Sequence, residues 1–198
     1  MKRSEIGKVY AIHTSKGYGI VQVCADKEEL MIGINVTQIR VFGKLYPTIP
    51  ENIEEILKGK EDFRVFCVVR TMVLPKYNMA TYLGRYDLPA DFQPTKYFKY
   101  TLYTRISETS GLTRDWIIDE AGLKEYKDGI ELKDWIENYL HMDSKKDDWK
   151  KIFSELDFAD IYNGLGLIED LENGYNPRNF LPADLDIPSK YLMKDMKG

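Results

Sequence analysis

Runs and alternations of apolar residues divide the first half of the chain into short strands. Near the N-terminus, two strand-forming runs flank the polar hinge Ser15-Lys16-Gly17. This pattern predicts a hairpin in which Gly17 supplies the φ > 0 position of a three-residue loop. Further predicted elements are a short helix that begins near Pro50 and strands at 31–42, 63–71, 77–86 and 97–106.

The spacing of apolar residues changes in the second half. A small hairpin is expected around Glu120-Ala121-Gly122, and helical spacing predicts helices at 132–140 and 149–156. The helical period continues through 158–165, after which Gly164 and Gly166 weaken a helix. Asn173-Gly174 is expected to end the next apolar stretch, and the proline-punctuated tail from residue 176 is expected to be extended.

These patterns together predict an α+β protein. The mostly β N-terminal half is expected to form a small, partly open antiparallel barrel over residues 1–106. The helix-rich C-terminal half, residues 107–198, is expected to comprise a small hairpin, helices and an extended tail that pack on the first half.

The pair of glycines in Gly17-Tyr18-Gly19 raises the question of a phosphate site. A phosphate-binding glycine loop leads from a strand into a helix, whose N-terminus faces the anion. Here the glycines lead into a second strand. We therefore expect both glycines to shape the backbone, with Gly19 at a bulge or at a close approach between strands.

The composition is that of an ordinary globular protein. The chain has 198 residues, of which 43% are hydrophobic, so a full core needs no disulfide or metal. Cys24 and Cys67 both lie in apolar runs and are expected to be free thiols. No secretory signal and no membrane-length apolar run is present, which favours a cytoplasmic protein without a membrane partner.

The charge is distributed unevenly along the chain. Residues 1–110 carry a balance of +4, whereas residues 111–198 carry −8. The segment from 155 to 186 contains eight acids and a single base, Arg178. Such a run is often only a solvated face, but it also fits a docking surface for a basic partner protein, and it repels nucleic acid. The candidate partner-binding residues are Asp157, Asp160, Tyr162, Glu169, Asp170, Glu172 and Tyr175.

No motif in the chain points to catalysis. The two histidines, His13 and His141, have no spacing typical of a metal site, and no serine occupies a nucleophile elbow. Asp115, Asp119 and Glu120 are acids close in sequence, a pattern that is common by chance. We therefore expect no catalytic residues, no metal, no cofactor and no small-molecule ligand.

Three blocks of the sequence resemble the Immunity protein 26 family. The blocks are IGKVYAIHTSKGYGIVQV, the segment FRVFCVVRTMVLPKYNMATYLGRYDLPADFQP with its LGRYDLP element, and RDWIIDEAGLKEYKDG. They span about residues 5–130, and residues 141–198 lie outside the resemblance. The family is regarded as predicted immunity proteins of bacterial polymorphic toxin systems, encoded beside toxins that are often nucleases.

The resemblance implies a mainly β, cytoplasmic protein that neutralises a toxin by binding it, and it carries over no catalytic residues. An acidic half agrees with this, because a nuclease toxin is basic where it binds phosphate. Two alternatives stay open. One is a nucleic-acid- or peptide-binding β-barrel module that uses exposed tyrosines, and the other is a hydrolase with a pocket near His13.

Overall fold

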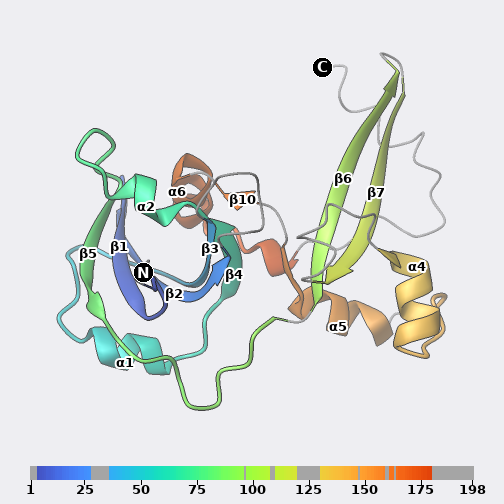
Figure 1. The fold of residues 1–198 in the computed structure, drawn as a ribbon, viewed down its shortest axis with the longest axis horizontal. Helices are drawn as coiled ribbons and strands as arrows, with labels where there is room; N and C mark the ends of the chain where they lie inside the picture. Colours follow the sequence, from blue (N-terminus) through green and yellow to red (C-terminus); the bar gives the residue numbers. More distant parts are fainter. Residues whose placement is uncertain are drawn as a thin grey trace. The chain divides into compact units, whose positions relative to one another are not determined.

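The computed structural model describes residues 4–27, 36–95, 97–107, 110–119, 130–146, 148–158, 161–162 and 164–179 (Figure 1). Its contacts divide the chain into two compact units, which we call unit 1 (Met1–Thr95 and Asp160–Pro177) and unit 2 (Lys96–Ala159 and Arg178–Gly198). Unit 1 contains a six-stranded sheet and unit 2 a four-stranded sheet. Residues 160–177, which the sequence placed with the second domain, therefore pack in the first unit.

The sheet of unit 1 is an antiparallel array to which one short parallel strand is added. In order across the sheet, its strands are β5 (Ala80–Arg85), β1 (Lys8–Thr14), β2 (Gly17–Lys27), β3 (Val36–Tyr46), β4 (Phe63–Cys67) and β10 (Ile161–Tyr162). The predicted barrel is not closed. Among the described strands, β10 pairs with the outer side of β4, so β5 and β10 remain as separate edges.

Helices cover both faces of this sheet. Ile53 and Leu57 of α1 (Ile53–Lys58) are buried on the face that carries Val9 and Ala11. The helices α2 (Val69–Met72) and α6 (Gly164–Asn173) bury apolar residues on the face that carries Tyr10 and Ile12. Because successive side chains of a strand point to opposite faces, burial on both faces explains the uninterrupted apolar run of β1.

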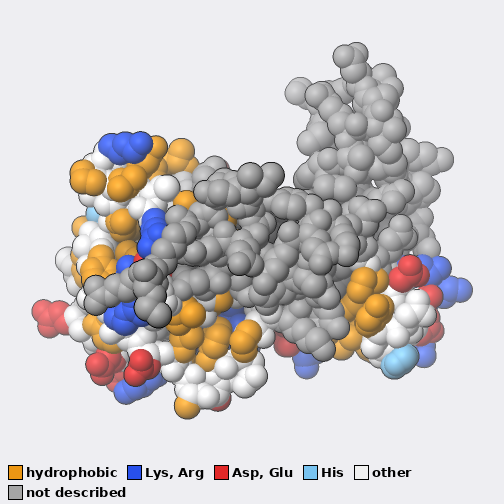
Figure 2. All heavy atoms as spheres, in the orientation of Figure 1, with side chains coloured by type: hydrophobic (Ala, Val, Ile, Leu, Met, Phe, Trp, Pro, Cys, Tyr) orange, Lys and Arg blue, Asp and Glu red, His pale blue; other side chains and the backbone are white. Residues whose placement is uncertain are grey.

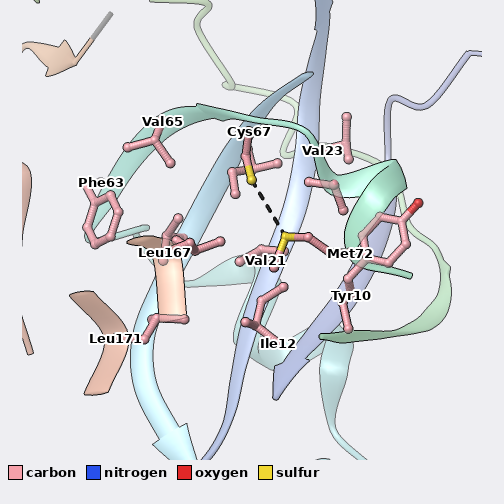
Figure 3. Close-up of a cluster of buried hydrophobic side chains, with 14 residues drawn as sticks. Tyr10, Ile12, Val21, Val23, Phe63, Val65, Cys67, Met72, Leu167 and Leu171 are labelled. Carbon is pink, nitrogen blue, oxygen red and sulfur yellow. Dashed lines mark hydrogen bonds between the residues drawn. The ribbon is translucent and has the colours of Figure 1, made fainter. Parts of the chain in front are cut away.

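The larger core of unit 1 lies under α2 and α6. Figure 3 shows Leu167 and Leu171 of α6 beside Phe63, Val21 and Ile12 of the sheet. Leu167 is fully buried and Leu171 is 3% exposed. Burial of each such side chain contributes roughly 1.5–3 kcal/mol, so α6 is held mainly by these contacts.

The first hairpin confirms the structural interpretation of the glycine pair. β1 and β2 pair with Thr14 opposite Gly17, so the connecting turn has two residues instead of the expected three. Gly17 has φ +131, and a Cβ there would lie 2.3 Å from the carbonyl oxygen of Tyr46. At Gly19 the pairing with β3 shifts register, and a Cβ would lie 2.8 Å from Leu171 Cδ1. Gly19 therefore marks a bulge and also a close approach of α6.

Both cysteines are buried thiols that form no disulfide, as the sequence predicts. The Cys24 thiol donates to the carbonyl oxygen of Gln38 at 3.3 Å, and Cys67 Sγ lies 3.7 Å from Met72 Sδ. Burial raises the pKa of the Cys67 thiol to about 12. The reactive thiolate form is therefore strongly disfavoured at neutral pH.

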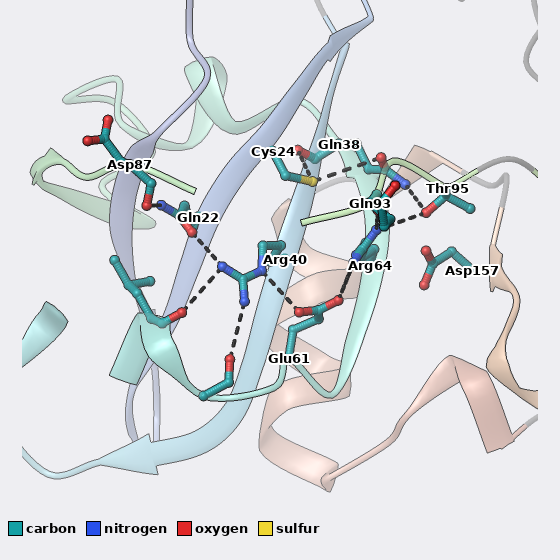
Figure 4. A network of polar contacts seen from close by, with 12 residues as sticks. Gln22, Cys24, Gln38, Arg40, Glu61, Arg64, Asp87, Gln93, Thr95 and Asp157 are labelled. Atoms are coloured by element: carbon teal, nitrogen blue, oxygen red, sulfur yellow. Dashed lines mark hydrogen bonds and ion pairs between the residues drawn. The ribbon is translucent and has the colours of Figure 1, made fainter. Parts of the chain in front are cut away.

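A buried polar network fastens α1 to the sheet (Figure 4). Arg40, only 2% exposed, donates to Gln22 Oε1 at 2.8 Å and to Glu61 Oε2 at 3.0 Å. It also donates to the carbonyl oxygens of Leu57 and Gly59, where α1 ends. A guanidinium satisfies several acceptors at once, which lets this face of β3 bury a charge beneath α1.

Unit 2 is built on a long hairpin with helices at one end. The strands β8 (Ile130–Glu131), β7 (Ser110–Asp119), β6 (Tyr97–Ser107) and β9 (Asp157–Phe158) follow one another across its sheet. Its helical segments are α4 (Leu132–Asp134), the π-helical η1 (Trp135–Tyr139) and α5 (Asp148–Glu155). The 3₁₀ turn η2 (Pro177–Asn179) lies where the chain passes between the units. The core of the helical end comprises Leu132, Trp135, Ile136, Trp149 and Phe153.

The described residues of the second half are less helical than the sequence predicts. The strand at 97–106 and the helices near 132–140 and 149–156 are confirmed. The helical period predicted through 158–165 is wrong, because β9 and β10 occupy part of this range and pair with two different sheets. The helix α6 begins at Gly164, where the sequence predicts weakening. The hairpin expected around residues 120–122 lies outside the described residues.

Candidate partner-binding groove

A groove of about 380 Å³ opens on unit 1 between the sheet and the end of α6. We call it the α6 groove and define it by its lining residues, which come from β3, from the start of β4 and the residue before it, and from the end of α6 and the turn after it. These are Gly43, Lys44, Asp62, Phe63, Asp170, Leu171, Gly174, Tyr175 and Asn176. Phe63 and Leu171 are buried, so the floor is apolar, whereas the walls are polar and charged.

The C-terminus of α6 sets the position of Tyr175. The N–H of Gly174 donates to the carbonyl oxygen of Leu171, and the N–H of Tyr175 donates to that of Asp170 at 2.9 Å. Gly174 has φ +63. These two bonds and the left-handed glycine form a Schellman motif, which satisfies the last helical carbonyls and turns the chain back. Tyr175 is thereby held at the groove with its side chain 46% exposed.

The opposite wall is formed by Asp62, just before β4. Its Oδ2 accepts a hydrogen bond from the Gly43 N–H at 2.5 Å, and its own N–H donates to the Val41 carbonyl oxygen. Asn176 Nδ2 donates to the Asp62 carbonyl oxygen at 3.2 Å. These bonds connect the two walls and hold the groove's shape.

The side chain of Glu172 is hydrogen-bonded to the turn of the first hairpin. Its Oε1 accepts the Ser15 N–H at 2.5 Å, and its carbonyl oxygen accepts a hydrogen bond from Lys16 Nζ. The hydrogen bond from Ser15, together with the charge of Lys16, lowers the pKa of Glu172. The backbone N–H of Ser15 in this turn is thus bound by one of the protein's own carboxylates and not by a phosphate.

Tyr175 and Asp170 influence one another electrostatically. Partial burial raises the pKa of the Tyr175 hydroxyl, and the nearby charge of Asp170 raises it further. The hydroxyl therefore stays protonated over a wide pH range, and the ring remains a neutral surface beside a carboxylate.

The structure brings together four of the seven residues that the sequence predicts as a partner surface. Glu169, Asp170, Glu172 and Tyr175 lie on α6 and its terminal turn, with Glu169 exposed and Asp170 half-buried. Tyr162 belongs to β10, where its backbone pairs with Cys67, and its side chain is not among those described. Asp160 lies outside the described residues.

Asp157 occupies a different environment from the one expected. It belongs to unit 2, is 3% exposed, and accepts hydrogen bonds from Arg178 at 2.7 and 3.1 Å. Arg178 is the single base of the acidic segment, so the charge pattern contains an internal pair. The pair of Asp157 with Arg178 therefore stabilises unit 2. A substitution that neutralises Asp157 would lower the stability of the fold and would not report on partner binding.

The histidines make structural contacts. His13 Nε2 lies 2.7 Å from Thr81 Oγ1, and its ring packs edge-on against Tyr18. His141 is exposed and follows η1 with φ +54. Within the described part of the chain, no group of three or more His, Cys, Asp or Glu side chains could hold a metal ion. Asp115 and Asp119 lie in β7 with side chains outside the description, and Glu120 is outside it entirely.

A buried carboxylate, Glu5, joins the N-terminus to α2. It is 5% exposed and accepts hydrogen bonds from Lys8 Nζ at 2.8 Å and from Arg70 Nη2 at 2.8 Å. Burial alone would raise the pKa of Glu5, but the hydrogen bonds and charges of Lys8 and Arg70 outweigh it and lower the pKa. The Tyr10 hydroxyl lies 3.4 Å from Oε2. This arrangement stabilises an ionised carboxylate, which is typical of a structural ion pair.

A second cavity, of about 340 Å³, lies between α1 and the segment that follows β5. It is lined by Glu54, Leu57 and Lys58 of α1 and by the consecutive residues Tyr86, Asp87, Leu88 and Pro89. Gln22 Nε2 donates to the Tyr86 carbonyl oxygen at 3.0 Å, which ties this segment to the buried network. Charges of both signs line it, so it favours no single ligand class.

Exposed tyrosines and cations gather on the β5 side of unit 1. Tyr82 is 51% exposed with Lys8 Nζ 5.9 Å from its ring, and Tyr77 is 47% exposed with Lys76 Nζ 4.6 Å from its ring. Figure 2 shows the loop between α2 and β5 at the upper left, with hydrophobic side chains beside a Lys or Arg. We call the four residues Lys8, Lys76, Tyr77 and Tyr82 the tyrosine–lysine surface.

Sequence reasoning missed Asp62, Lys44 and Asn176 as members of the α6 groove. Asp62 follows Glu61 in a charged stretch that reads as a surface turn, and nothing in the local pattern connects it with α6. The available signal was the run of acids at Glu169, Asp170 and Glu172, which located one wall only.

None of the described helices is both long and apolar enough to span a bilayer.

Comparison of the chain with models of protein families, with curated proteins and with solved structures found no match. A functional proposal for this chain is therefore based on the geometry of the α6 groove and on the resemblance seen in the sequence.

Proposed function

We propose that the protein is an immunity protein that neutralises a cognate bacterial toxin by binding it directly, in the cytoplasm. The single observation that carries this proposal is the α6 groove. It combines an apolar floor, carboxylates from two segments far apart in the sequence, and an exposed tyrosine. Binding sites between proteins rely on such aromatic anchors within a polar rim.

The charge of this region also favours a basic partner. From Gly164 to Asn176 the chain carries Glu169, Asp170 and Glu172 and no Lys or Arg. Lys44 at the rim lies over the ring of Tyr46, 5.0 Å from its centroid. A nuclease or another toxin that binds phosphate presents cations to its substrate, and an acidic groove can compete for them. The resemblance to the Immunity protein 26 family supports the same proposal.

A growth assay tests this function. The toxin domain encoded next to the gene would be induced in a bacterial host with and without the protein. We expect the wild-type protein to restore growth, and the double variant Asp170→Asn with Tyr175→Ala to protect much less. Glu51→Gln with Glu55→Gln, a control that changes two exposed acids on and beside α1, should protect fully. Absence of protection by the wild-type protein would refute the proposal.

One observation favours a second function, binding of single-stranded nucleic acid. The tyrosine–lysine surface places exposed rings beside cations, which is the combination that stacks bases and neutralises phosphates. Lys8 is also paired with Glu5, so Lys76 is the cation expected to contact a phosphate. Fluorescence anisotropy with a labelled oligonucleotide would decide. Binding that weakens steeply with salt and falls on Tyr77→Ala with Tyr82→Ala would support this second function, whereas no binding at low salt would exclude it.

A further inference from the structure

We infer that the toxin docks along the outer face of α6, with Leu165 as an apolar anchor at one end of the contact and Tyr175 as an aromatic anchor at the other. This inference rests on the proposed function and extends it, because Leu165 lies outside the α6 groove. The occupant of this face is the basic toxin.

The pattern of burial along α6 defines its outer face. Leu167 is fully buried and Leu171 is 3% exposed, and both pack on the sheet (Figure 3). Leu165, Glu169 and Asn173 are all exposed and follow one another at intervals of four residues. Residues four apart lie above one another on a helix, so these three form one stripe on the side away from the sheet.

Leu165 is the residue of this stripe that the packing of unit 1 does not explain. It is 65% exposed, the largest exposed fraction among the large hydrophobic side chains described. An aliphatic side chain in this position makes no polar contact with water that a partner would have to replace. A partner that covers Leu165 therefore gains binding free energy from the buried apolar area.

Further apolar surface adjoins Leu165 at the N-terminal end of α6. A Cβ on Gly164 would lie 2.7 Å from Met79 Sδ and 3.0 Å from Met72 Cγ, so the loop between α2 and β5 packs against the start of the helix. Met79 and Val73 of this loop are only partly buried. Two segments far apart in the sequence thus supply apolar surface here, which is typical of a contact site between proteins.

The size of a stable protein contact also requires more surface than the α6 groove. Each partner buries about 800 Å² in a standard interface, whereas a groove of about 380 Å³ accommodates only a few side chains. Since α6 has 10 residues and rises about 1.5 Å per residue, its outer face extends the contact by about 15 Å. The groove and the outer face meet at the C-terminal turn, where Tyr175 is 46% exposed.

Glu169 places a negative charge in the middle of the outer face. It is exposed, whereas the carboxylate of Glu172 accepts the Ser15 N–H. Along the face the order is therefore apolar, acidic and aromatic, so that the two anchors hold the partner and the charge between them attracts a cation. Glu169 would repel nucleic acid, and an aliphatic leucine offers no ring on which bases stack. The outer face thus fits a basic protein.

Rates of association and dissociation, measured by surface plasmon resonance on the immobilised toxin encoded beside the gene, test this inference. Leu165→Ala leaves the charge unchanged, so we expect an unchanged association rate and a dissociation rate about 5-fold faster than that of the wild type. Glu169→Gln should show the opposite behaviour, with slower association at low salt and little change in dissociation.

Ile152→Ala is the matched control, because Ile152 is an apolar residue that is 39% exposed on another helix, α5 of unit 2. It should dissociate like the wild type, and circular dichroism should show that both alanine variants keep the fold. A wild-type protein that binds the toxin, together with an unchanged dissociation rate for Leu165→Ala or an equal acceleration for Ile152→Ala, would overturn this inference alone. Absence of toxin binding by the wild type would refute the proposed function itself.

Discussion

At the scale of single residues, two glycines carry different kinds of constraint. Gly17 combines φ +131 with a Cβ position 2.3 Å from the Tyr46 carbonyl oxygen, so any side chain meets rigid backbone. Gly174 has φ +63, but a Cβ there would have no atom within 4 Å. Strain and steric overlap therefore act together at Gly17, and strain acts alone at Gly174.

This difference predicts unequal costs of substitution. Gly17→Ala should lower the free energy of unfolding by about 3 kcal/mol, because the φ strain adds to the clash. Gly174→Ala, the matched control, should cost about 1 kcal/mol. Urea unfolding followed by circular dichroism measures both. Equal effects would show that the carbonyl of Tyr46 moves aside freely.

The ionisation of Glu61 makes the stability contributed by the buried network depend on pH. Burial alone would raise its pKa, but the charges of Arg64 and Arg40 and a backbone hydrogen bond lower the pKa below its ordinary value of 4.5. Because the folded-state pKa is the lower one, the ionised form contributes stability that is fully present above about pH 4.5. This contribution is lost as the pH falls through the folded-state pKa.

Glu61→Gln should therefore be less stable than the wild type at pH 7, and its stability should change less between pH 5 and pH 3. Glu55→Gln, an exposed control on α1, should keep the wild-type profile. Urea titrations at a series of pH values, followed by circular dichroism, give both curves. Tryptophan fluorescence serves as an internal reference for unit 2, where Trp116, Trp135 and Trp149 all lie. A Glu61→Gln curve parallel to that of the wild type would contradict the assigned role.

At the scale of elements, α6 shows why periodicity alone misleads. The apolar residues Phe158, Ile161 and Leu165 fit a helical repeat, yet the chain uses the first two in separate short strands. Pairing with existing sheet edges satisfies the backbone there, and this gain is invisible in a local pattern. The helix then begins at Gly164, beside the sulfur of Met79, where a Cβ would lie 2.7 Å away.

Two leucines of α6 test how this helix is held. Leu167→Ala should cost about 2–5 kcal/mol, because Leu167 is fully buried among the residues of the larger core. Leu165 is 65% exposed on the same helix, and Leu165→Ala should change stability by no more than about 0.5 kcal/mol. Chemical denaturation of the two variants decides. Similar costs would mean that helix propensity, and not burial, dominates.

Long elements with strong patterns were predictable from the sequence. The first hairpin, the strand that contains Phe63 and the helical segments that contain Trp135 and Trp149 follow from their apolar spacing. The strand at Phe63 was predicted too long, since α2 begins at Val69. The end of this strand and the start of α2 are both apolar. A helix this short is not long enough to show a helical repeat of apolar residues, so the sequence does not separate it from the strand.

At the scale of the whole molecule, the path of the chain decides which charges meet. Asp170 of α6 lines the same groove as Asp62 because residues 160–177 belong to unit 1, and no local pattern predicts that return. Asp157, only a few residues earlier, belongs to unit 2 and pairs with Arg178. The acidic segment that the sequence treats as one surface is therefore divided between two units. Its composition predicted one wall of the groove, and the opposite wall depends on tertiary contacts.

Docking of a basic toxin at the α6 groove is tested most directly by the association rate measured across salt concentrations. The toxin encoded beside the gene would be mixed with the wild type, with Glu169→Gln plus Asp170→Asn, and with Glu51→Gln plus Glu55→Gln. Both variants remove two exposed or half-exposed charges, so they change the net charge equally. We predict that the α6 variant, which changes Asp170 of the groove and its neighbour Glu169, associates about 3-fold more slowly at low salt, with a flatter salt dependence, while the α1 variant stays near the wild type. Equal rates and equal salt slopes for the two variants would contradict docking at this groove.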